Sequence, residues 1–137
     1  MEGREKVNPK QFLQIGGAIL LVLGLVGFAG VFSTKGSFFW LDNGENVAHT
    51  GLGIIAIAAS FLLKDAQMQK WLVAAVGVVA LFFTVYGFAV AGDGSGANAF
   101  GLANLESPAD DILHLVVGVW ALAAAFKPMG MGAMAKA

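Results

Sequence analysis

Four long apolar stretches, separated by short polar segments, restrict this chain to a membrane environment. Two of them, 12–32 and 71–91, contain no charged residue over 21 positions. Two shorter ones cover 47–63 and 112–126. A helix of 21 residues is about 31 Å long, which matches the hydrocarbon thickness of a bilayer. We therefore predict an all-α fold, a four-helix transmembrane bundle that forms a single membrane domain over 1–137.

The scarcity of charge agrees with this prediction and excludes several protein classes. Charged residues make up 12% of the chain, against about a quarter in an ordinary soluble domain. The net charge of −1 provides no basic field for nucleic acid. The chain has no cysteine, so disulfides and thiolate metal sites are excluded. The segment 12–32 follows basic residues as a secretory signal would, but it is longer than a usual signal core.

The basic residues predict the orientation of the four spans. One side of a four-span topology carries seven of them: Arg4, Lys6, Lys10, Lys64, Lys70, Lys127 and Lys136. The other side carries only Lys35. Because basic residues are retained on the cytoplasmic side, we expect both termini in the cytoplasm and the protein in the cell membrane.

The chain also contains an internal repeat. At an offset of 65, segment 45–53 matches 110–118, each with an acid first, a histidine fifth and a glycine ninth. At an offset of 60, Gly-Phe-Ala at 27–29 matches Gly-Phe-Ala at 87–89. We therefore predict two tandem helical hairpins, about 11–63 and about 70–126. Both run in the same direction across the membrane, which makes the repeat a parallel one.

The repeat brings forward one candidate site. His49 and His114 are the only histidines, and each follows an acid, Glu45 or Asp110, by four residues. That spacing places both side chains on one face of a helix. The four residues are candidate ligands for a metal such as zinc. Alternatively, the two imidazoles could bind the iron of haem b, with the glycine four residues after each one leaving room. A proton-sensitive contact is a third possibility.

Helix capping explains the same acids without a ligand, and we favour this interpretation. Asp42 and Ser107 would be N-caps, Pro108 would take the first helical position, and Glu45 and Asp110 would fall at the third. The histidines would then hydrogen-bond a neighbouring helix or loop. On this interpretation no cofactor is needed, and zinc and haem b are the alternatives.

The first copy of the motif, Asn46-Val47-Ala48-His49-Thr50-Gly51-Leu52-Gly53, resembles a known pattern. Similar N-x-x-H-x-x-x-G segments occur in a family of small four-helix bacterial and archaeal membrane proteins of unknown function. The second copy departs from the pattern, with Asp111 at the position of Asn46. The resemblance implies four helices and brings no activity with it.

No catalytic fingerprint of the common hydrolase, metalloprotease or nucleotide-binding classes is present. We therefore expect a non-enzymatic protein with a structural or accessory role, such as a subunit of a larger membrane complex. Its expected partners are the lipid bilayer and other membrane proteins or further copies of itself, and not nucleic acid. The alternative function is a metal- or haem-binding membrane protein with a paired-histidine site near the outer leaflet.

Overall fold

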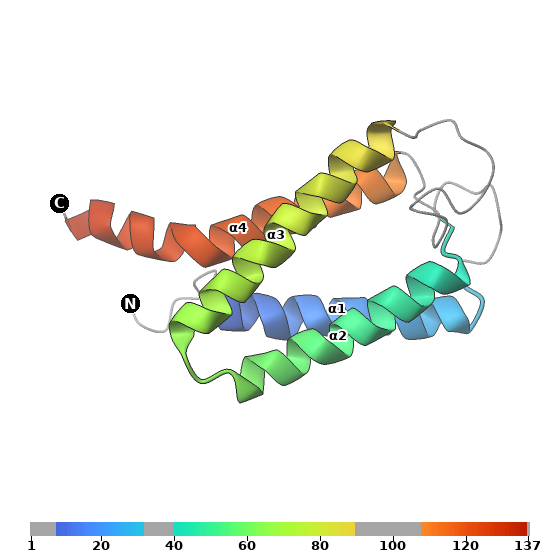
Figure 1. Ribbon diagram of the computed structural model, residues 1–137, viewed down its shortest axis with the longest axis horizontal. Helices are drawn as coiled ribbons and strands as arrows, with labels where there is room; N and C mark the ends of the chain where they lie inside the picture. Colours follow the sequence, from blue (N-terminus) through green and yellow to red (C-terminus); the bar gives the residue numbers. More distant parts are fainter. Residues whose placement is uncertain (1–7, 32–39, 90–107, 137) are drawn as a thin grey trace.

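The computed structural model describes residues 8–31, 40–89 and 108–136, and in the last range it describes side chains as far as Phe126. Its helices are α1 (Pro9–Phe28), α2 (Asn43–Leu62), α3 (Ala66–Ala89) and α4 (Ala109–Lys136). The described residues contain no strand, and the predicted all-α fold is confirmed. Helices α1 and α2 pair as one antiparallel hairpin, and α3 and α4 pair as a second (Figure 1).

All four helices are long and apolar enough to cross a membrane, α4 through its part Ala109–Phe126. Only 22% to 39% of the residues in their apolar windows are buried inside the molecule. Large apolar side chains therefore cover the outside of the described helices. A surface of this kind is costly in water but suits contact with lipid chains. The protein is thus a small multi-pass membrane protein.

The two helices of the first hairpin begin at side-chain caps. In α1, Gln11 N donates to Asn8 Oδ1 at 2.8 Å, and Pro9 occupies the first turn. In α2, Glu45 N donates to Asp42 Oδ1 at 2.9 Å, and Asp42 N donates to Glu45 Oε2 at 3.2 Å. This reciprocal pair is a capping box, as predicted.

The start of α4 differs from the prediction by one residue. The helix begins at Ala109, so Pro108 precedes it and does not occupy its first position. The Pro108 carbonyl accepts the first helical hydrogen bond, from Ile112 N at 2.9 Å. Asp110 is consequently the second helical residue, and Ser107 lies outside the described residues. A one-residue shift costs little because the proline carbonyl can begin the hydrogen-bond ladder as well as a serine carbonyl can.

A short turn joins the two hairpins. Gln69 of α3 is buried, and its Nε2 donates to the carbonyls of Leu63 at 2.7 Å and Ser60 at 3.4 Å. These bonds satisfy carbonyl groups at the end of α2, which have no partner within their own helix. At the start of α3, Gln67 N donates to Asp65 Oδ1 at 2.8 Å. Helices α1 and α3 both begin at this end of the molecule, and Lys10 and Lys70 lie near these two helix starts. We call it the lysine end.

Within each hairpin, glycines allow the helix backbones to approach closely. A Cβ atom at Gly53 of α2 would lie 2.6 Å from Leu21 N and 2.7 Å from the Gly17 carbonyl oxygen of α1. A Cβ atom at Gly118 of α4 would lie 2.7 Å from Leu81 Cδ2 of α3. Van der Waals contact of this kind is the main attraction between helices in lipid, where the hydrophobic effect no longer drives them together.

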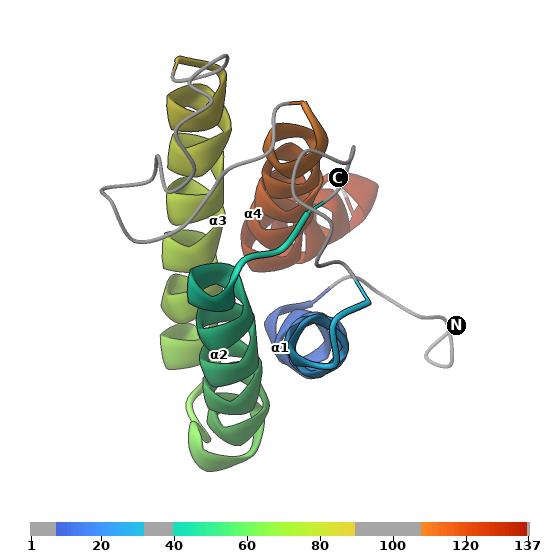
Figure 2. The same cartoon turned by 90° about the vertical axis from the view of Figure 1, so that its right-hand side faces the viewer.

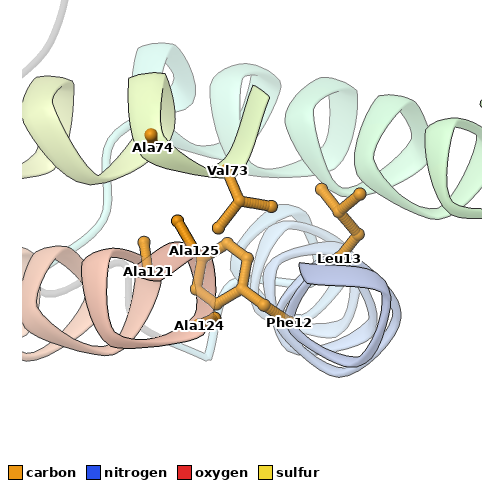
Figure 3. Packing of buried hydrophobic residues seen from close by; sticks show 7 residues of the cluster. All are labelled: Phe12, Leu13, Val73, Ala74, Ala121, Ala124 and Ala125. Carbon is orange, nitrogen blue, oxygen red and sulfur yellow. The ribbon is translucent and has the colours of Figure 1, made fainter. Parts of the chain in front are cut away.

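The two hairpins pack together near the lysine end. Phe12 of α1 inserts toward α3 and α4 (Figure 3), and its ring meets the Trp120 ring edge-on with centroids 4.7 Å apart. The buried cluster comprises Phe12, Leu13, Val73, Ala74, Ala121, Ala124 and Ala125. An end-on view shows α1 and α2 on one side and α3 and α4 on the other (Figure 2). The hairpins diverge toward the opposite end, where α2 and α4 begin (Figure 1). We call this the histidine end.

Candidate functional site

Two acids from different hairpins meet at the histidine end. Glu45 is in the first turn of α2 and Asp110 is in the first turn of α4, and they are only 6% and 3% exposed. Their carboxyl groups lie close together. The pair is therefore a polar link between hairpins whose main packing lies at the other end.

The two imidazoles lie one helical turn further along α2 and α4. Both are half-buried, and they are close enough for charge on His114 to act on His49. The Nδ1 atom of each ring is buried and has no hydrogen-bond partner. The Asp110 carbonyl lies one turn before His114 and acts on its ring, but it makes no hydrogen bond of normal geometry with Nδ1. On its other side, the His114 ring centroid lies 5.7 Å from that of Phe83.

The structure thus gathers the four predicted site residues at one end of the molecule, as a carboxyl pair and an imidazole pair. Among the described residues, no group of three or more histidines and acids is arranged to hold a metal ion. The zinc set of Glu45, His49, Asp110 and His114 stays a prediction, and so does haem b on His49 and His114.

The glycines that follow the histidines do not leave the space expected for a haem. A side chain at Gly53 would point into the backbone of α1, and one at Gly118 would point at Leu81 and the Gly77 carbonyl of α3. The space that these glycines provide is occupied by the partner helix of the same hairpin. They are explained by helix packing, in which small residues bring backbones together.

Two further polar residues are more deeply buried than the predicted ones. Asn46 is 2% exposed and Asp111 is fully buried. Asn46 packs against Gly27 of α1, and Asp111 packs against Gly87 of α3. The signal was present in the sequence, because each residue follows the acid of one of the two matched segments and each glycine begins a matched Gly-Phe-Ala triplet. Only the packing shows that these two matches meet.

Neither a protein-family model, nor a curated protein, nor a solved structure matches this chain. The resemblance based on the Asn46–Gly53 motif therefore stays a prediction. The function has to be argued from the geometry of the residues themselves.

Proposed function

We propose that this chain is a non-catalytic membrane protein with a structural, accessory role, in which the polar residues of the histidine end join the two hairpins. One observation carries the proposal: the Glu45 carboxyl group closes the cap of α2 and also lies close to the carboxyl group of Asp110 in α4. The Glu45 side chain thus takes part both in the cap of α2 and in the contact between the hairpins. Helix capping and contact between the hairpins therefore explain the two acids that first suggested a ligand site.

A polar link is an effective way to hold hairpins together in a bilayer. Lipid chains are as apolar as leucine, so burying apolar side chains between helices gains little. Polar contacts between membrane helices contribute roughly 0.6–2 kcal/mol each. In this protein the Phe12 cluster holds the lysine end, and the Glu45–Asp110 pair holds the histidine end. Together they define the angle between the hairpins.

Matched contacts support the proposal that the two hairpins are copies of one unit. In the first hairpin Gly27 meets Asn46, and in the second Gly87 meets Asp111. The two glycines are offset by 60 residues and the two polar residues by 65, as in the sequence match. The same small–polar contact thus recurs at the corresponding place in each hairpin.

For orientation, the distribution of basic residues supports a lysine end in the cytoplasm, with both termini on that side of the cell membrane. The cysteine-free chain allows a direct test. Single cysteines at the exposed positions Lys64 and Asn43 would be labelled in intact cells with a maleimide that cannot cross membranes. Asn43→Cys should react and Lys64→Cys should react only after lysis. The reverse pattern would contradict this orientation.

An accessory role further implies association with other membrane proteins or with copies of this chain. The test is the mass of the tagged full-length protein, extracted in a mild detergent and measured by light scattering. We expect a species well above the 14.1 kDa monomer, with a constant stoichiometry between preparations. A uniform monomer, at a protein concentration in the micelles as high as that in a membrane, would contradict the proposed role.

Binding of a metal or haem is the second candidate function, and a separate observation favours it. Two histidines from different hairpins lie near each other, and the buried Nδ1 atom of each lacks a partner. Imidazole nitrogen atoms are common ligands of zinc and of haem iron. An absorption spectrum and metal analysis of the purified protein distinguish the two functions. A haem band or a stoichiometric metal that is lost in His49→Ala would favour this second function over the first.

A further inference from the structure

A groove at the lysine end lies between the starts of α1 and α3. It has a volume of about 280 Å³. Lys10 and Lys70 line it together with Asn8 and Gln67, and buried alanines of α4 contribute to its wall. We propose that this groove binds the phosphate group of an anionic phospholipid. The groove is far from the carboxyl and imidazole pairs and does not depend on the function proposed for them.

The charges around the groove favour an anion. Neither α1 nor α3 has an acidic residue in its first turn, whereas α2 has Glu45 there and α4 has Asp110 and Asp111. The partial positive charge at the start of a helix is thus matched by first-turn acids at the histidine end, whereas at the lysine end α1 has no acid in its first turn and α3 has only its capping residue Asp65. Two lysines add to that positive charge around the groove. Among the described residues of this end, Asp65 is an acid, but it caps α3 and does not line the groove.

Aromatic contacts place the ammonium groups at the edge of the apolar helices. Lys70 Nζ lies 5.3 Å from the ring centroid of Trp71 and 5.1 Å from that of Phe126. Lys10 Nζ lies 5.9 Å from the Phe61 ring. Such contacts retain a lysine charge near a membrane surface while its stem lies along apolar residues. We therefore place the two charges at the ends of the membrane-length helices, where lipid phosphates would lie.

The surroundings favour a lipid over free phosphate. Met68 and Trp71 lie on the same turns of α3 as the groove residues Gln67 and Lys70 and are exposed, so an acyl chain could pack against them. Basic pockets between membrane helices on the cytoplasmic side are known to bind anionic headgroups, and each basic residue near an anionic surface contributes about 1 kcal/mol. A phosphate that enters the groove would contact both lysines beside two helix starts, where the partial positive charge favours an anion.

The test uses the full-length protein in nanodiscs of phosphatidylcholine, with and without phosphatidylglycerol. Lipid retained after mild extraction is counted by native mass spectrometry. We expect wild type to retain phosphatidylglycerol preferentially, and the double variant Lys10→Gln/Lys70→Gln to lose that preference on the order of tenfold. Glutamine preserves most of the aliphatic stem, and circular dichroism checks the fold. The single variants, each expected to lose part of the preference, replace the double variant if it does not fold.

Lys64→Gln is the matched control, because it removes the same charge from the same end at a residue that does not line the groove. It should retain phosphatidylglycerol as wild type does. An equal loss in Lys64→Gln would mean that general surface charge attracts the lipid, and the proposal would be wrong. In a separate arm, inorganic phosphate is added to discs of phosphatidylcholine alone. If phosphate stabilised the fold of the protein in these discs, and the protein showed no preference for phosphatidylglycerol, the groove would be assigned to free phosphate. That result would overturn the lipid proposal.

Discussion

Asn46 Oδ1 in α2 lies so close to Gly27 in α1 that a Cβ atom at position 27 would overlap it. The corresponding overlap in the second hairpin would join Gly87 and Asp111 Oδ1. Each hairpin therefore places a deeply buried polar side chain against the backbone of a glycine in its partner helix. In lipid, such a contact hides the polar group and lets the helices approach at the same time.

Adding a methyl group at either glycine should destabilise the hairpin that contains it. Gly27→Ala and Gly87→Ala are each expected to lower the free energy of unfolding by about 1–3 kcal/mol, because buried polar groups must move or helices must separate. Thermal or denaturant unfolding in detergent micelles measures the effect.

Gly51→Ala is the control for this pair. It lies in α2 like Asn46, but a Cβ atom there would have no neighbour within 4 Å. Because alanine favours a helix over glycine by roughly 0.5–1 kcal/mol, this variant should be as stable as wild type or slightly more so. Equal losses in Gly51→Ala and Gly27→Ala would show that the close contact is not what matters.

Replacing Glu45 separates the capping and linking roles of its side chain from any role as a charged ligand. Glutamine can still cap α2 and donate to Asp110, so Glu45→Gln should cost less than about 1 kcal/mol. Glu45→Ala loses the cap and leaves Asp110 without this partner, at a cost of about 2 kcal/mol. Unfolding of the two variants, measured side by side, checks the difference. If both lost the same stability, the hydrogen bonds described for Glu45 would not explain its role.

Truncating Phe12 should weaken the contact between the hairpins at the lysine end. Its ring is buried against α3 and α4, so Phe12→Ala leaves a cavity and is expected to cost about 2 kcal/mol or more. Phe28→Ala is the matched control, because Phe28 is at the other end of α1 and is 51% exposed. Unfolding in the same detergent compares them. A similar loss in both variants would contradict the assigned packing of Phe12.

Added zinc distinguishes the two functions proposed for the histidine end. If Glu45 and the histidines act only in packing, the melting temperature should not depend on zinc in wild type or in Glu45→Gln. If they bind zinc, the metal should raise the melting temperature of wild type by binding the folded state. That rise should disappear in His49→Ala/His114→Ala and shrink in Glu45→Gln. The same samples, without added metal, provide the absorption spectrum that tests for haem.

Much of the local structure could be predicted from residue patterns. The apolar segments predicted four membrane-length helices, because a helix that crosses lipid must be continuously apolar. Asp42 and Glu45 predicted the start of α2 to the residue, since a capping box depends on residues three apart in the chain. The start of α4 was misplaced by one residue, because Ser107 and Pro108 offer neighbouring ways to begin a helix.

The sequence by itself therefore determined the helices, their membrane character and the candidate residues, because these depend on near neighbours in the chain. The contacts among those residues were decided only by the tertiary structure. Side-chain spacing places Glu45 and His49 on one helix face, but it cannot show that Glu45 reaches Asp110 in the other hairpin. Nor can it show that Gly53 faces α1. A glycine has no side chain, so the side on which it leaves space is known only when the partner helix is in place.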